Sequence, residues 1–414
     1  MVMLAGNNET LCRLSNQRAG FGCDDMDAVD REIAAAKQLE AFIDGKSGGA
    51  GKGWYRIAYT AAEARQILDS GKLAVVLGAE VPNLFGCRKN EPTCDQAHVT
   101  NRLDHYYGLG LRHVFPIHNA DNRFGGTAIY NELFAFSNKI ITGDPWQVGN
   151  CLAAPGADFH LQRLDDLNDG ADIATVVAPH QLLFYRALIA LTGALPPRPP
   201  SGPNCNARGL TGLGEFLINR LIDKKMIIDV DHSSAFSANR ILDIAETRQY
   251  PAVVMGHTGF IENNQPGVNK RAEGNKTPAQ VERVRRLGGL VAPILHQGNV
   301  SEIVQGPRSD GTAVPNDCGN SSKTWAQAYL YAVEKMKGGS LGGAVALGSD
   351  FNGFAGEPGP RFGPEACSGE KSCKDGSGND VICDQGTPFA YPFPLHGAPG
   401  SLDRSVIGQR TYDY

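Results

Sequence analysis

Five apolar runs that lie far apart in the sequence each end in a residue that can ionise. The runs are LAVVLGAE, LRHVFPIH, MIIDVDH, AVVMGH and AVALGSD, and their last residues are Glu80, His118, His232, His257 and Asp350. One histidine in such a place is unremarkable, since a lone buried histidine is more often structural than functional. Five ionisable endings in runs that are otherwise mostly apolar favour one shared site.

The residue types are those of a hydrolytic metal site. Neutral imidazole and carboxylate are ordinary zinc ligands, so Glu80, His232 and His257 form a three-ligand set that leaves a fourth position for water. Water held there can attack a carbonyl near neutral pH. A further carboxylate must take the proton and deliver it to the leaving group, and we assign that step to Asp350. Zinc is the expected ion, with manganese as the alternative.

Strands must carry these residues to one place. The apolar runs predict strands over residues 73–80, 111–118, 226–232, 252–257, 290–295 and 344–350. Runs of Val, Ile, Leu and Ala without polar alternation are typical of strands buried on both faces of a parallel sheet. Helices are predicted between them over residues 27–42, 60–70, 211–224, 235–247, 277–287 and 323–337. The alternating order predicts an α/β fold with right-handed crossovers.

The pattern leaves the sheet either closed or open. A (β/α)8 barrel of the TIM type and a doubly wound sheet share this periodicity, and only six strands are evident where a barrel needs eight. In a barrel the carboxyl ends of all strands open on one face, which would bring the five endings together. Local signals agree with the helix positions, because Thr60 and Glu63 form a capping-box pattern and Pro278 falls at a first helical position.

Length and composition favour one domain over residues 1–414, with long loop insertions at about 140–205 and 355–395. The net charge of −5 and the lack of a basic face argue against nucleic acid as a partner. The sequence has no apolar stretch long enough for a membrane span. It also has no glycine-rich loop of the nucleotide-binding kind opening a helix.

The ten cysteines fall largely in expected loops. Two of them flank the polar segment RKNEPT (Cys87 and Cys94), two bracket an insertion (Cys151 and Cys205), and three share one loop (Cys367, Cys373 and Cys383). Close loop spacing predicts disulfides and an exported protein, periplasmic or extracellular, whose signal would lie upstream of Met1. A cytosolic protein with scattered thiols is the alternative. A four-cysteine zinc site is less favoured, because no CxxC pair occurs.

Four segments resemble a known family. They are IIDVDHSS at 227–234, PAVVMGHTGF at 251–260, GGLVAP at 288–293 and ALGSDFNGF at 346–354. They resemble the membrane dipeptidase family (renal dipeptidase-like, peptidase M19), which belongs to the amidohydrolase-type metal-dependent barrels. The resemblance implies a (β/α)8 barrel of the TIM type, which is the fold we expect. The resemblance covers roughly residues 25–350 and is strongest after residue 226.

The resemblance implies a role for each ionisable ending. It implies that His232 and His257 bind metal and that Glu80, in LGAEV, bridges two ions. It also implies that Asp350, in GSDFNG, is the catalytic aspartate. His118, in PIHNADN, matches a residue that could polarise the scissile carbonyl.

A small substrate, most simply a dipeptide, is implied as well. Arg271, in NKRAEGNKTPAQ, is the best match to the basic residue that faces the substrate carboxylate. Asn352 and His118 complete the expected substrate contacts. His296, in ILHQGN, also follows a strand; we expect a surface or structural residue, with a role near the substrate as the alternative. A homodimer is left open.

The sequence departs from the family at its start. The family opens with a strand bearing H-x-D, whose two residues bind the first of two metals, whereas no histidine precedes His98 here. We expect either that the chain lacks its native N-terminus, with a matching loss after GQRTYDY, or that one metal site has been lost. Asp24, Asp25 and Asp27 could substitute as ligands, but acids in this pattern indicate a helix N-terminus.

Three functions therefore stay open. The leading one is hydrolysis of a peptide or related amide bond in a small substrate, with one or two divalent ions. The second is a lactonase or esterase on the same scaffold, because the insertions reshape the mouth of the barrel. The third is a non-catalytic binding protein descended from such a hydrolase, which the missing H-x-D motivates.

Overall fold

The computed structural model of the chain describes residues 1–7, 9–14, 20–130, 132–151, 203–263, 272–295, 322–339, 344–350, 373–374 and 380–381, with Phe159 and Gly193. Three residues singled out in the sequence, Arg271, His296 and Asn352, lie outside these ranges. So do Cys367 and Cys383, and most of both insertions.

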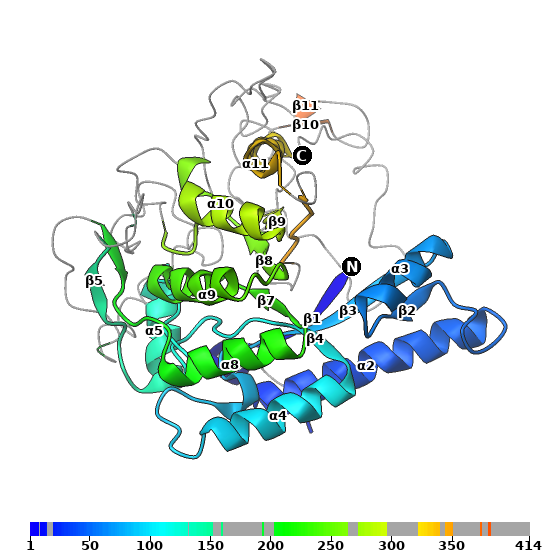
Figure 1. Cartoon of the computed structure of the whole chain (residues 1–414), viewed down its shortest axis with the longest axis horizontal. Coiled ribbons are helices and arrows are strands. Elements are labelled where there is room, and N and C mark those ends of the chain that lie inside the picture. The colour runs from blue at the N-terminus through cyan, green and yellow to red at the C-terminus, as the bar shows by residue number, and fades with distance from the viewer. Residues whose placement is uncertain are drawn as a thin grey trace.

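A parallel sheet forms the centre of the molecule (Figure 1). Its strands are β1 (Val2–Gly6), β2 (Tyr55–Ile57), β3 (Leu73–Glu80), β4 (Leu111–Val114), β7 (Ile227–Asp229), β8 (Val253–Thr258) and β9 (Leu290–Pro293). They are arranged in the order β1-β3-β4-β7-β8-β9, with β2 also paired to β3, and every pair is parallel. The predicted α/β fold with a parallel sheet is confirmed.

Closure into an eight-stranded barrel is not seen among the described strands. The path runs from β1 to β9, and these two end strands do not pair with each other in the described part of the chain. The strand predicted over 344–350 is reduced to two isolated parallel bridges beside β9, Val291 to Val345 and Ile294 to Gly348. Two short antiparallel pairs lie apart from the main sheet, β5 (Val148–Asn150) with β6 (Asn204–Asn206) and β10 (Cys373–Lys374) with β11 (Asp380–Val381).

In the main sheet the sequence prediction missed β1 and β2 and overextended three strands, since 111–118, 226–232 and 290–295 shorten to β4, β7 and β9. β1 is the short apolar run VMLAG, which the prediction passed over, and β2 is only three residues long, too short to show a pattern. The run 111–118 leaves the sheet after Val114, although Phe115 N still donates to Ala79 O at 3.1 Å. Pro116 has no N–H with which to continue the ladder, so the four residues that end in His118 form a loop.

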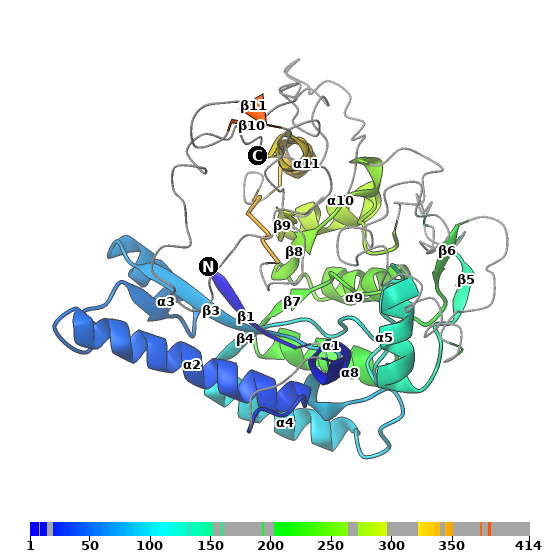
Figure 2. The ribbon, with the colours of Figure 1, turned by 180° about the vertical axis from the view of Figure 1, so that it is seen from behind.

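Helices follow one another around the sheet (Figures 1 and 2). They are α1 (Glu9–Leu14), α2 (Asp25–Lys46), α3 (Ala61–Asp69), α4 (Gln96–Leu109), α5 (Glu132–Thr142), α8 (Gly212–Asp223), α9 (Ala235–Thr247), α10 (Pro278–Leu287) and α11 (Ser322–Met336), with the 3-10 turns η1 (Leu84–Gly86) and η3 (Ile261–Asn263). Consecutive helices from α8 to α11 contact each other, and α4 contacts α8. Their buried faces join the sheet in one apolar core, to which Val29, Leu103, Leu217, Ile241 and Val284 contribute.

The helix starts agree with the local signals. Thr60 caps α3 by accepting from Glu63 N at 3.1 Å. The Glu63 carboxylate accepts from Tyr59 N, whereas the predicted capping box would have it accept from Thr60 N. Pro278 is the first residue of α10, as predicted. Asp24 caps α2 by accepting from two backbone N–H groups, so the DDMD segment starts a helix.

Candidate metal centre

Three predicted ligands meet at the carboxyl ends of their strands. Glu80 is the last residue of β3, His232 follows β7 by three residues, and His257 lies near the end of β8. Glu80 Oε1 is 3.0 Å from His232 Nε2 and 3.1 Å from His257 Nε2, and the two Nε2 atoms are 2.7 Å apart. Parallel strands open on one edge of the sheet, which is why residues so distant in sequence meet there.

This donor set fits a divalent cation. Glu80 Oε1 is buried and has no hydrogen-bond donor among the described residues, although imidazole nitrogens surround it. Atoms that share one tetrahedral zinc at ordinary bond lengths lie about 3.3 Å apart, close to the separations seen here. One carboxylate with two imidazoles is a common open zinc set. The three side chains therefore have both the types and the convergence that a cation requires.

The side chains of the cluster shift one another's pKa. Burial alone raises the pKa of Glu80, but the imidazoles of His257 and His118 outweigh it and hold that pKa well below its usual range. Burial lowers the pKa of His257, but the Glu80 carboxylate outweighs it and raises that pKa well above the ordinary value. Glu80 is therefore ionised at neutral pH.

His118 lies beside the three ligands. Its Nε2 is 3.4 Å from Glu80 Oε1, and its ring centroid is 4.4 Å from that of His232. Burial, reinforced by His232, lowers the pKa of His118 to about 3. The imidazole is therefore neutral at neutral pH, and its Nδ1 has no partner among the described residues.

Asp350 ends the segment that bridges to β9 through Val345 and Gly348. It stands two residues after Gly348, and a Cβ built on Gly348 would be 2.7 Å from His257 Cα. The Asp350 carboxylate acts electrostatically on both His257 and Tyr130. Asp350 and His232 both have left-handed backbones, with φ of 45° and 60°. Such strain in residues other than glycine is typical of functional sites.

Two buried aspartates that the sequence prediction missed, Asp229 and Asp231, contact residues of the strands that carry the cluster. His257 N donates to Asp231 Oδ2 at 2.8 Å, and Asp231 Oδ1 is 3.5 Å from Lys276 Nζ. Asp229 forms a second buried pair with His113, whose Nε2 lies 2.9 Å from Asp229 Oδ2. The two aspartates interrupt the otherwise apolar run MIIDVDH, and this was the signal available in the sequence.

Tyr130 was also missed. Its Oη lies 3.2 Å from His232 Nδ1, the nitrogen that faces away from Glu80. Burial, with the carboxylates of Asp231 and Glu273, raises the pKa of Tyr130 well above its usual value, so the hydroxyl stays protonated. The surrounding GTAIYN segment is loop sequence, and nothing in its pattern marks the tyrosine.

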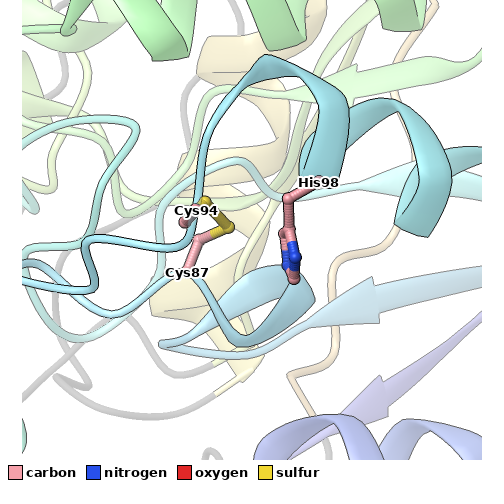
Figure 3. A group of neighbouring side chains, drawn as sticks. All are labelled: Cys87, Cys94 and His98. Carbon is pink, nitrogen blue, oxygen red and sulfur yellow. A yellow bond between two sulfur atoms is a disulfide. The ribbon is translucent and has the colours of Figure 1, made fainter.

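A second group of residues with metal-binding side chains contains a disulfide, so its two cysteines are not free to bind a metal ion. Cys87, Cys94 and His98 lie together, but the two sulfurs are bonded to each other (Figure 3). His98 Nε2 is 2.9 Å from Phe85 O. Two more disulfides, Cys12–Cys23 and Cys151–Cys205, occur in the described residues. Three disulfides are compatible with an oxidising compartment, and none of the described helices is long and apolar enough to cross a bilayer.

Comparisons with known proteins yield distant likenesses. No family model and no curated protein matches the chain. Solved structures that it resembles include dipeptidase AC, a metallopeptidase of family M19, at 15% identity and a TM-score of 0.46, with 86% of this chain and 72% of that chain covered. A metallopeptidase from Rhodobacter sphaeroides, liganded with a phosphinate mimic of the dipeptide L-Ala-D-Ala, is similar at 16% identity and a TM-score of 0.43. The match covers 80% of this chain and 64% of that chain.

An amidohydrolase from Pseudomonas aeruginosa gives 12% identity and a TM-score of 0.43, with 86% of this chain and 67% of that chain covered. The chain thus spans only 64% to 72% of the length of these three proteins.

Proposed function

We propose that this protein is a metal-dependent hydrolase that cleaves an amide bond in a small substrate, most simply a dipeptide. The observation that carries the proposal is the convergence of Glu80 Oε1 with the Nε2 atoms of His232 and His257, all within 3.1 Å of one another. Nothing else in the described core explains why three ionisable side chains should be buried against each other there.

Glu80, His232 and His257 would hold the cation. A divalent ion bound there supplies the Lewis acidity that lets water attack an amide carbonyl near neutral pH. Zinc suits two imidazoles and a carboxylate, and manganese is the alternative. A second ion, bridged by Glu80, is an extension of the proposal that metal analysis of the loaded protein tests.

Two further side chains would act on the substrate. Asp350 takes the proton from the attacking water and returns it to the leaving nitrogen. Two carboxylates outside the ligand set, Asp231 and Asp350, act electrostatically on His257, and Asp231 already accepts from His257 N. His118 donates an N–H to the scissile carbonyl as a neutral imidazole, a state that its pKa of about 3 secures at neutral pH. Arg271 and Asn352, outside the described residues, are proposed to bind the substrate carboxylate and backbone.

The test is dipeptide hydrolysis by protein loaded with zinc or manganese. Asp350→Asn is expected to lower kcat by about 10²–10⁴-fold while metal content is unchanged, because proton transfer is lost and the ligands stay. Asp104→Asn, at an exposed carboxylate paired with Lys224, is the matched control and should leave kcat unchanged. Activity that survives a chelator, or a normal kcat in Asp350→Asn, would exclude the mechanism.

The rival functions give different results in the same assay. A lactonase or esterase would leave dipeptides intact and hydrolyse an ester with the same chelator sensitivity. A non-catalytic descendant would hold less than one ion per chain after loading.

We further propose an exported protein, in keeping with three disulfides, and a sheet that is part of a (β/α)8 barrel. The mass of the protein in solution tests the homodimer.

A further inference from the structure

Tyr130 contacts the ring nitrogen of His232 that faces away from the other two ligands. His232 presents Nε2 to Glu80 at 3.0 Å and to His257 at 2.7 Å, while Nδ1 lies 3.2 Å from Tyr130 Oη. Both nitrogens of this imidazole therefore have a defined partner. Tyr130 itself is half-buried and does not reach the ligand cluster except through His232 among the contacts described.

The same loop also holds the backbone of His232. Ala128 N donates to His232 O at 2.7 Å, and the Thr127 hydroxyl contacts the carbonyl oxygens of both His232 and His118. His232 has a φ of 60°, a conformation that a residue other than glycine adopts only when its surroundings impose it. Residues 127–130 thus constrain this histidine at its carbonyl group and at its ring.

Tyr130 is in turn held by the segment that precedes α10. Ile129 N donates to Glu273 Oε2 at 2.8 Å, and Glu273 N donates back to Ile129 O at 3.2 Å. Gly274 packs directly on the tyrosine ring, since a Cβ at this position would lie 2.6 Å from Tyr130 Oη. The hydroxyl is therefore aimed at His232 by a close-packed support that leaves it little freedom to turn.

We propose that Tyr130 is a positioning residue for the metal ligand His232, an inference that rests on the proposed function. A neutral imidazole that turns Nε2 toward a cation carries its proton on Nδ1, and that N–H then donates to Tyr130 Oη. Partners of this kind fix the tautomer and the ring orientation of ligating histidines, and their loss typically weakens metal binding about 10–100-fold. The loop 127–130 and Gly274 thus belong to the metal centre although none of their atoms is a ligand.

The experiment measures zinc affinity by competition with a chromophoric chelator and compares the Co²⁺ absorption spectra. Tyr130→Phe is expected to weaken zinc binding about 10–100-fold and to change the Co²⁺ spectrum, because only the Nδ1 partner is removed. Tyr250→Phe is the matched control, since its hydroxyl donates to Met226 O at 2.6 Å, away from the site. It should leave both readouts unchanged.

Gly274→Ala provides a second variant that keeps the hydroxyl but displaces the ring. It should weaken zinc binding in the same direction, and thermal unfolding of the metal-free variants shows whether each is folded. If wild-type protein binds zinc and both folded variants bind it equally well, the inference is wrong and the proposed function stands. If wild-type protein binds no zinc, the proposed function itself fails.

Discussion

Glu80 and Glu273 are both buried, but they differ in their hydrogen-bond partners and in their pKa shifts. Glu80 is 7% exposed and Glu273 is 2% exposed. Glu273 Oε2 accepts from Ile129 N at 2.8 Å and from Asn206 N at 2.9 Å, and its Oε1 accepts from Ala235 N at 2.7 Å. Glu80 Oε1, by contrast, has no hydrogen-bond donor among the described residues and faces three imidazoles.

The difference separates a carboxylate with a structural role, Glu273, from one that is available to bind a metal ion, Glu80. Backbone N–H groups of three segments converge on Glu273, which ties the loop before α5, β6 and the start of α9 together. Burial raises the pKa of Glu273 to about 8, although those donors and Lys276 oppose the shift. Glu80 is kept ionised by its neighbours instead. Of two equally hidden carboxyl groups, the one with unsatisfied oxygen is the candidate ligand.

The largest effect expected from this contrast is on metal binding. Glu80→Gln should weaken zinc affinity by more than about 100-fold and abolish hydrolysis, because a direct ligand is lost rather than one of its supports. Glu273→Gln should change zinc affinity far less, since its oxygens bind backbone only. Isothermal titration of both variants with zinc compares them, and equal losses would erase the distinction between the two carboxylates.

The sequence could predict one of these glutamates and not the other. Glu80 ends an apolar run, and strand ends of a parallel sheet share one edge, so its meeting with His232 and His257 follows from pattern and geometry. Glu273 stands in a loop of mixed polar residues, and its three partners come from segments 38 to 144 residues away. No local signal encodes contacts that only the assembled fold creates, and Tyr130 was missed for the same reason.

Raising the pH should destabilise the protein through Glu273. Its pKa is about 8 in the folded protein and roughly 4.3 in an unfolded chain. Between these values the folded state holds one more proton, so the free energy of unfolding falls as pH rises, by at most about 1.4 kcal/mol per pH unit. Below pH ~4.3 this contribution is complete, and above pH ~8 it is lost.

Chemical unfolding of metal-free wild type and Glu273→Gln between pH 5 and pH 8 measures this dependence. The wild type should lose stability relative to the variant across that range, because glutamine does not titrate. Parallel curves for the two proteins would mean that Glu273 is ionised throughout, and that its three N–H donors outweigh burial.

At a fixed low pH, Glu273→Gln should itself destabilise the protein by about 1–3 kcal/mol. Both oxygens of the protonated carboxyl group can accept a hydrogen bond, whereas the amide nitrogen of glutamine can only donate. One of the three backbone N–H groups therefore loses its acceptor in a buried place. Denaturant unfolding at pH 5 measures the change. Glu282→Gln, at an exposed carboxylate paired with Arg285, is the matched control, and a similar loss there would remove any special role for Glu273.

The smallest effect concerns α10, the helix that follows Glu273 in the sequence. Thr277 and Gln280 form a reciprocal capping box at the start of α10, with Gln280 N donating to Thr277 Oγ1 at 3.3 Å. Thr277→Ala should cost about 1 kcal/mol of stability and leave zinc affinity unchanged, because Glu273 is fixed by its own backbone donors. Thr60→Ala removes the exposed cap of α3 for comparison. If zinc affinity falls in Thr277→Ala and not in Thr60→Ala, the metal centre depends on the start of α10 as well as on the backbone contacts of Glu273.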